Sequence, residues 1–339
     1  MNNVNLQGLG FADTYLIPQY SEVSSRDQVD TKVRLPRNIF GQPWDIQVPV
    51  ISANMDTVTG SEMAREMSFA GAVGALHRFL PIKDNVEEYL TVRGHRVPTD
   101  CFVSVGVNRD SKERTKALFD VGARYFVIDI AHGHSKLMRD MIDWLKGEYP
   151  DVFLMAGNVA TAAGAYDLAC WGADAIKIGI GPGAVCLTKN VTGVTVPQLG
   201  AIQNCFEAMT RIKDTKRPLL IADGGIREYG DIAKAIAAGA DMVMIGSLLA
   251  SCPEAPGERI HGKKVYRGMA SKEAMSVIRD TTSMPTPEGT SMLLNPSNPV
   301  CDIVAEIAGG LRSAFSYSNA KTLKEFQERA MFGIKKGVR

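Results

Sequence analysis

The sequence lacks several patterns that would assign it to a common class of protein. Its six cysteines form no Cys-x-x-Cys pair, which argues against a disulfide framework or a zinc site and favours reduced thiols in a cytoplasmic protein. No apolar run reaches the length of a transmembrane helix, and residues 1–7 lack the basic and hydrophobic parts of a signal peptide. The net charge is only +1, so we expect no bulk attraction to nucleic acid or to an anionic membrane.

What the sequence does contain is a repeated alternation of short apolar runs with helical segments. Hydrophobic residues make up 45% of the 339 positions, and no Gly-x-Gly-x-x-Gly follows the first apolar run. This pattern predicts an α/β protein with a (β/α)8 TIM barrel in preference to a doubly wound sheet. The expected strands are 48–53, 72–76, 101–105, 125–130, 152–156, 175–180, 219–222 and 242–245. The expected helices are 61–69, 111–121, 134–148, 162–170, 196–209 and 229–238.

We expect residues 1–339 to form a single barrel domain, with 276–300 as an irregular, mobile C-terminal flap within it. In such a barrel the chemistry lies on the loops that follow the strands. The loop after the sixth predicted strand is the most distinctive, because the glycine-rich stretch 179–183 precedes Cys186 and Thr188. A thiol on such a loop is a candidate nucleophile, although a free cysteine often serves only as a small apolar residue.

Two further loops suggest a phosphate site. Gly224-Gly225 and Gly246-Ser247 follow the seventh and eighth predicted strands, where barrels usually bind phosphate through exposed backbone amides. Asp223 is a candidate to bind ribose hydroxyls. The alternative is that these glycines only turn the chain and that Asp223 caps the next helix. His132 and His134 look like a metal pair, but no third ligand stands at the usual spacing, so we do not expect zinc.

The motifs at the predicted strand ends occur in a characteristic order along nearly the whole chain. They are 53–59 (Ala-Asn-Met-Asp-Thr-Val-Thr), 129–135 (Asp-Ile-Ala-His-Gly-His-Ser), 156–159 (Ala-Gly-Asn-Val), 179–183 (Gly-Ile-Gly-Pro-Gly), Cys186, Thr188, 222–226 (Ala-Asp-Gly-Gly-Ile), 244–248 (Met-Ile-Gly-Ser-Leu) and 266–269 (Tyr-Arg-Gly-Met). In this combination the chain resembles the IMP dehydrogenase / GMP reductase family. The resemblance implies a barrel enzyme that acts on C2 of a purine nucleoside 5′-monophosphate, uses a nicotinamide cofactor and forms a homotetramer.

The resemblance also implies roles for individual residues. Cys186 would add covalently to purine C2, Thr188 and Glu288 would handle the proton, and Arg78 stands where reductases commonly have a catalytic lysine. The implied substrate-binding residues are Asp223, Gly224, Gly225, Gly246, Ser247, Tyr266, Gly268, Met269 and Met55. The implied cofactor-binding residues are Asp129, Asn158, Gly179, Ala131 and Ser135. The carbonyl groups that resemble a site for a monovalent cation such as K⁺ are those of Gly181, Gly183 and Cys186.

Of two omissions, the second favours a GMP reductase, which would convert GMP to IMP and ammonia with NADPH or, alternatively, NADH. Dehydrogenases of the family usually carry a regulatory module after the second strand, whereas Arg78 and Cys101 are only 23 positions apart. Some dehydrogenases also lack this module, so its absence carries little weight. Dehydrogenases also place in their flap an adjacent Arg-Tyr that activates water. Residues 276–287 contain Arg279 followed by Asp280, and no tyrosine. A reductase does not need that water-activating pair.

Other positions depart from the reductase pattern. Ala184 replaces a phosphate-contacting serine, Ala270 replaces a base-contacting serine, and 285–287 (Pro-Thr-Pro) stands where reductases have an arginine. The stretch 268–271 (Gly-Met-Ala-Ser) looks more like a dehydrogenase. We therefore keep three alternatives: an IMP dehydrogenase, a reductase of a variant purine nucleotide, and a non-catalytic nucleotide-binding scaffold. The scaffold would have no need of the catalytic residues named above.

Overall fold

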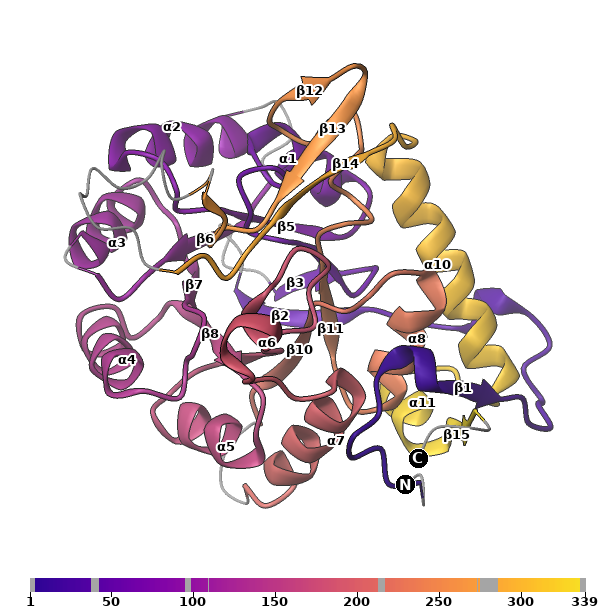
Figure 1. The fold of residues 1–339 in the computed structure, drawn as a ribbon. Coiled ribbons are helices and arrows are strands. Elements are labelled where there is room, and N and C mark those ends of the chain that lie inside the picture. Colours follow the sequence, from indigo (N-terminus) through magenta and orange to yellow (C-terminus); the bar gives the residue numbers. More distant parts are fainter. Residues whose placement is uncertain are drawn as a thin grey trace.

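The structure is a computed structural model that describes residues 4–37, 43–94, 99–108, 110–212, 217–272, 274 and 286–335. Its centre is a closed barrel of eight parallel strands, as the alternation of apolar runs predicts (Figure 1). Each of the eight predicted runs contains or overlaps one barrel strand. The barrel strands are β4 (Val50–Ser52), β5 (Val73–Leu76), β6 (Phe102–Val105), β7 (Tyr125–Asp129), β8 (Phe153–Val159), β9 (Ala175–Ile178), β10 (Leu219–Asp223) and β11 (Met242–Ile245).

Helices surround the barrel and cover the outer faces of its strands (Figure 1). The six predicted helices are present with ends that differ by at most two residues. They are α1 (Ser61–Phe69), α3 (Ser111–Asp120), α4 (Lys136–Glu148), α5 (Ala162–Cys170), α7 (Gln198–Met209) and α8 (Tyr229–Ala237). Because barrel strands are buried on both faces, nearly all of their residues are buried, and short runs of apolar, β-branched residues suffice to specify them.

Among the described residues, four helices lie outside the ranges expected from the sequence: α2 (Ile82–Arg93), α6 (Thr188–Thr192), α10 (Val300–Tyr317) and α11 (Leu323–Arg329). Helix α2 buries Asn85, Tyr89 and Val92, which have helical spacing but include a polar residue, so its apolar pattern is weak. Among the described residues, no helix combines the length and the apolar character that crossing a membrane would require.

Short elements outside the barrel join distant parts of the chain. Strand β1 (Thr14–Ile17) pairs with β15 (Met331–Ile334), which brings the two ends of the chain together (Figure 1). The hairpin of β2 (Val33–Arg37) and β3 (Pro43–Ile46) contacts the barrel where Trp44 packs against Tyr125, with ring centroids 4.9 Å apart. The remaining short helices are η1 (Phe11–Asp13) and η2 (Arg26–Gln28).

A three-stranded sheet lies outside the barrel, at the end where the barrel strands finish. It consists of β12 (Arg259–Ile260), β13 (Lys263–Arg267) and β14 (Ser291–Leu294), all antiparallel (Figure 1). The flap predicted over 276–300 falls partly on residues 275–285, which lie outside the described residues. Its remaining part contains β14 and ends where α10 begins, at Val300.

Asp100 is a buried carboxyl group at the opposite end of the barrel, directly before β6. Its Oδ1 accepts hydrogen bonds from the amide of Cys101 (2.9 Å) and the hydroxyl of Tyr89 (3.4 Å). Its Oδ2 has no hydrogen-bond partner among the described residues. Burial raises the pKa of Asp100 to about 7, against the opposing effects of the Cys101 amide and of Arg93. This end of the barrel therefore contains a group that titrates near neutral pH.

We expect Asp100→Asn to stabilise the protein in a pH-dependent way. Between about pH 4 and about pH 7 the folded chain binds more protons at Asp100 than the unfolded chain, so this carboxyl lowers stability as the pH rises. The substitution removes that penalty, so the gain in the free energy of unfolding should be larger at pH 8 than at pH 5, by about 3 kcal/mol. Urea unfolding of both proteins at the two pH values measures the difference. An equal change at both would contradict the assignment.

Candidate active site

The residues predicted to form the site gather at the carboxyl ends of the barrel strands. Most of these residues lie on the loops that follow β4, β5, β7, β8, β9, β10 and β11. The other residues lie on or beside β13 and β14. Since all eight strands are parallel, these loops lie at one end of the barrel, which is where barrel enzymes carry their active sites.

The loop that carries Cys186 begins at Gly179, directly after β9. Gly179 has a φ of +149°, and a Cβ atom placed there would lie 2.0 Å from the carbonyl oxygen of Asp223. Only glycine allows this approach, so the chain turns tightly over the end of β10. The following residues form turns, in which the amide of Cys186 donates to the carbonyl of Gly183 (3.2 Å). This geometry leaves Cys186 half-buried at the mouth of the barrel.

Cys186, Thr188 and Glu288 form one chain of hydrogen bonds. The Cys186 thiol donates to Thr188 Oγ1 (3.3 Å), and the Thr188 hydroxyl donates to Glu288 Oε2 (2.8 Å). The backbone of Glu288 is fixed on both sides, since its carbonyl accepts from the amide of Leu187 (2.7 Å) and its amide donates to the carbonyl of Ala270 (3.1 Å). A proton can therefore move between the thiol and the carboxylate through a single hydroxyl group.

The surroundings of Cys186 differ from those of three other cysteines. Cys101, Cys205 and Cys252 are fully buried, and burial raises the pKa of Cys205 to about 12 and that of Cys252 to about 11. Burial also raises the pKa of Cys101. Thiols of this kind are chemically inert, because the reactive form is the thiolate. Cys186 instead combines partial exposure with a hydroxyl and a carboxylate, as a nucleophile requires.

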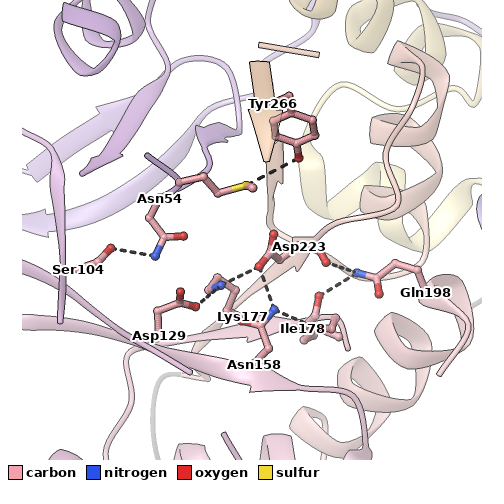
Figure 2. Close-up of polar contacts among 11 residues, drawn as sticks. Asn54, Ser104, Asp129, Asn158, Lys177, Ile178, Gln198, Asp223 and Tyr266 are labelled. Atoms are coloured by element: carbon pink, nitrogen blue, oxygen red, sulfur yellow. Dashed lines mark hydrogen bonds and ion pairs between the residues drawn. The ribbon is translucent and has the colours of Figure 1, made fainter. Parts of the chain in front are cut away.

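A buried lysine that the sequence reasoning did not single out lies at the centre of the site (Figure 2). Lys177, on β9, has only 3% of its side chain exposed, and its Nζ lies 2.6 Å from Asp129 Oδ1 and 2.7 Å from Asp223 Oδ2. It thus joins a carboxylate at the end of β7 to one at the end of β10. A lysine is rarely buried in an apolar strand unless it has a charged partner. Its presence at position 177 was therefore the signal in the sequence that could have indicated this site.

The three charges of this cluster stabilise one another. Burial alone would lower the pKa of Lys177, but the carboxylates of Asp129 and Asp223 outweigh burial, so the pKa is raised. Burial alone would raise the pKa of Asp129, but the ammonium of Lys177 and the nearby guanidinium of Arg78 outweigh it, so the pKa is lowered. The lysine and Asp129 are therefore both ionised at neutral pH. Arg78 lies beside this cluster, as its place after β5 predicts.

Two amide side chains extend the cluster (Figure 2). Asn158 Nδ2 donates to Asp223 Oδ2 (2.9 Å) and to the carbonyl of Gly179 (2.7 Å). Gln198 Nε2 donates to the carbonyls of Ile178 (2.8 Å) and Asp223 (3.2 Å). Both amide oxygens are buried and have no hydrogen-bond partner among the described residues. Asp223 thus takes part in the cluster, and helix α8 begins several residues later, after Glu228.

The predicted nucleotide-binding residues Tyr266 and Met55 also meet. The Tyr266 hydroxyl, on β13, lies 3.7 Å from the sulfur of Met55 (Figure 2). It also lies 2.7 Å from where a Cβ of Gly246 would stand, so the ring packs directly over that glycine. Arg267, the next residue, forms an ion pair with Asp56 in the loop after β4. These contacts bring the sheet of β12–β14 onto the mouth of the barrel.

Several predicted residues lie farther from this centre. The hydroxyl of Ser135 accepts from the amide of Met138 (3.4 Å) and so caps α4, and Ala131 is exposed in the preceding loop. His134 Nε2 lies 2.8 Å from Asp167 Oδ2. Gly224, Gly225 and Ser247 occupy the predicted turns after β10 and β11 and are all half-buried.

Comparison with known proteins identifies the family. A sequence model of the IMP dehydrogenase / GMP reductase domain matches residues 8–336, which is nearly the whole chain. The chain belongs to the IMP dehydrogenase / GMP reductase family. Members of this family are oxidoreductases that act on purine nucleoside monophosphates with NAD or NADP, so the chain is an oxidoreductase of purine nucleotides.

Relatives within the IMP dehydrogenase / GMP reductase family carry both names. An inosine-5′-monophosphate dehydrogenase of Nitrosopumilus maritimus is 31% identical over 462 residues, which cover 96% of this chain and 95% of that protein. A GMP reductase of Leishmania major is 30% identical over 471 residues, which cover 96% of this chain and 94% of that protein. An inosine-5′-monophosphate dehydrogenase of Rhizobium tropici is 44% identical over 243 residues, which cover 68% and 48% respectively. Identity alone therefore does not separate the two reactions.

Proposed function

We propose that this protein is a GMP reductase, which uses NADPH to convert GMP to IMP and ammonia. The observation that favours this reaction over IMP oxidation is the segment 276–287, which lacks an adjacent Arg-Tyr and contains no tyrosine. A dehydrogenase must hydrolyse a covalent intermediate and so needs a group that activates water. A reductase must instead protonate a departing amine, and the chain from Cys186 through Thr188 to Glu288 is suited to that task.

The proposed reaction divides into two balanced steps. In the first, the Cys186 sulfur bonds to C2 of the purine, and the C2–N bond to the exocyclic amine breaks. The thiol proton passes through Thr188 to Glu288 and leaves with the amine as ammonia. In the second, C2 takes up a hydride, which bound NADPH would supply, the C2–S bond breaks, and Cys186 takes back a proton from solvent. The two steps replace one difficult exchange at C2 with two easier ones.

The ends of β7 and β8 fit a nicotinamide group. The amide oxygen of Asn158 is buried and has no partner among the described residues, so it is free to accept a hydrogen bond from the carboxamide of the cofactor. Asp129 lies beside it and is held by Lys177. We propose that Asp129, Asn158 and Gly179 contact the nicotinamide, with Ala131 and Ser135 in the loop that continues from β7. The choice of NADPH over NADH is part of the proposal.

The nucleotide would bind on the other side of Cys186. We propose that Asp223 binds the ribose hydroxyls through the oxygen that does not face Lys177 and Asn158. The phosphate would meet the backbone amides of Gly224, Gly225, Gly246 and Ser247, beside the ring of Tyr266, which packs over Gly246. Tyr266, Gly268, Met269 and Met55 would enclose the base and phosphate, and Arg78 would complete the catalytic group beside Asp129. These assignments come from the family resemblance, and the gathering of the residues at the barrel mouth supports them.

A monovalent cation such as K⁺ would be held by the carbonyls of Gly181, Gly183 and Cys186. The loop that carries them forms turns and a single bridge, so few of its carbonyls take part in regular ladders. Oxygen ligands of this kind suit a hard cation. Bound there, the cation would stabilise the conformation of the loop that presents Cys186.

We further propose that the chain assembles as a homotetramer. Within the family resemblance, the segment 302–317, which lies in α10, corresponds to the C-terminal region of tetrameric relatives. Sedimentation velocity at micromolar concentration should give the mass of four chains. A monomer over the whole concentration range would contradict this prediction.

A panel of four assays tests the proposed reaction against the alternatives. GMP with NADPH, GMP with NADH, IMP with NAD and IMP with NADP are each followed by the near-ultraviolet absorbance of the reduced nicotinamide. The proposal predicts an absorbance decrease with GMP and NADPH and no increase with IMP. An increase with IMP and NAD would instead indicate the dehydrogenase, which the stretch 268–271 resembles. No change in any assay would favour a variant purine nucleotide or a scaffold.

A further inference from the structure

A second buried lysine lies in the sheet that covers the barrel mouth. Lys264, on β13, has no exposed surface, whereas its neighbour Lys263 on the same strand is exposed. Burial of an ammonium group is costly unless each of its protons finds an acceptor. The partners of Lys264 therefore indicate what the residue does.

The ammonium of Lys264 is enclosed by three consecutive backbone carbonyls. Its Nζ donates to the oxygens of Ala255 (2.8 Å) and Gly257 (3.0 Å), and to that of Pro256 between them. Gly257 has a φ of +100°, and a Cβ there would lie 3.3 Å from Thr57 and 3.5 Å from Lys264 Nζ. All three ammonium protons are thus used to fix one short segment, 255–257, which ends the loop that follows β11.

This contact joins three segments that meet at the barrel mouth. The loop after β11 begins with Gly246 and Ser247 and ends at the three carbonyls. Strand β13 carries Lys264 and Tyr266 on the same face, because side chains alternate along a strand. The amide of Arg267 donates to Thr57 Oγ1 (3.3 Å), which connects the same strand to the loop after β4.

We propose that Lys264 is a positioning residue for the purine nucleotide: its ammonium holds the loop after β11, with Gly246 and Ser247, against the strand that carries Tyr266. This inference rests on the proposed assignment of those residues to nucleotide binding. Lys264 does not touch the nucleotide. It would fix the distance between two groups that bind the same phosphate, and a displacement of about 1 Å between such groups weakens the binding of that phosphate.

The charge of Lys264 depends on pH in a range where the protein can be assayed. Burial, together with the positive charge of Arg259 on β12, lowers the pKa of Lys264 to about 8, while Asp56 in the loop after β4 raises it. A neutral amine has only two protons and directs a lone pair at the third carbonyl. The contact with 255–257 therefore weakens as the pH rises above this value.

Substitution of the two neighbouring lysines separates a positioning role from a general effect of charge. We expect Lys264→Met to raise the KM for GMP by about tenfold or more, and the calorimetric Kd values for GMP and IMP by a similar factor. Both kcat and the KM for the cofactor should change by less than about threefold. Lys263→Met should match the wild type in all of them. Unchanged nucleotide binding in a folded Lys264→Met protein overturns this inference alone. Failure of the wild type to bind either nucleotide overturns the proposed function as well.

Chemical rescue separates the effect of the ammonium charge of Lys264 from the effect of the shape of its side chain. Lys264→Ala retains Cβ, so n-propylammonium supplies the missing three carbons and the charge, and propan-1-ol supplies a similar shape without the charge. We expect saturable recovery of GMP affinity with n-propylammonium and none with propan-1-ol. Equal effects of the two compounds would overturn the proposal.

The wild-type protein provides a test that needs no substitution. Ribose 5-phosphate carries the phosphate and lacks a base that titrates, so its inhibition constant reports on the phosphate site. We expect this constant to increase between about pH 7 and about pH 9, because Lys264 loses its proton in that interval. A constant value over the interval would overturn the proposal, even if every variant failed to fold.

Discussion

Replacement of Cys186 by alanine is expected to lower kcat by more than about a thousandfold while GMP still binds. The reason is that the thiol forms the bond to C2, and neither Thr188 nor Glu288 can replace a sulfur nucleophile. The alanine removes one polarisable atom from a half-buried loop position, so the turn made by Gly183 and residue 186 should persist. Initial rates with GMP and NADPH, and GMP affinity by calorimetry, measure the two expectations separately.

The matched control for this prediction is Cys170→Ala. Cys170 is an exposed cysteine at the end of α5, away from the site, and its replacement should leave the rate unchanged. A Cys186→Ala protein that keeps more than a few per cent of the wild-type rate would remove the covalent mechanism from the account.

Replacement of Glu288 by glutamine is expected to lower kcat by about a hundredfold, with little change in GMP affinity. Glutamine keeps the size of the side chain, and its amide oxygen can still accept the 2.8 Å hydrogen bond from Thr188. It cannot take the proton from Cys186 or return it to the departing amine. The loss should therefore appear in kcat, and the protein should unfold at the same urea concentration as the wild type.

Two further variants test the proton path: one is a control, and the other breaks the path at Thr188. Glu258→Gln changes an exposed glutamate on the loop before β12 and should leave the rate unchanged. Thr188→Val removes the hydroxyl that connects Cys186 to Glu288 and should resemble Glu288→Gln, since either change breaks the same path. Near-normal deamination of GMP by the Glu288→Gln protein would show that Glu288 has another role.

The barrel was predictable because its signal is local. Each strand is a short apolar run that is buried on both faces, such as residues 175–178, and eight such runs alternate with amphipathic helices. The positions of the predicted site residues followed from the same reasoning, because parallel strands place their carboxyl ends together. Cys186 and Asp223 could therefore be expected at one end of the barrel before their contacts were known.

The contacts of the site could not be predicted from the sequence, because they join residues that are far apart along the chain. Thr188 and Glu288 are 100 residues apart, and Lys177 and Asp223 are 46 apart. Lys177 sits in a strand whose other residues are apolar, and nothing local identifies its two partners. Lys264 and Lys263 are adjacent and chemically identical in the sequence. Only the carbonyls of 255–257 distinguish the buried one.

The proposed reaction removes the exocyclic amine of GMP and replaces it with hydrogen. GMP that carries a heavy-nitrogen label in this amine tests it directly, with the products analysed by mass spectrometry after incubation with NADPH. The proposed reaction should give labelled ammonia and unlabelled IMP in equal amounts, each matched by one NADPH consumed. Recovery of all the label in unreacted GMP, together with conversion of IMP to XMP in the presence of NAD, would contradict it.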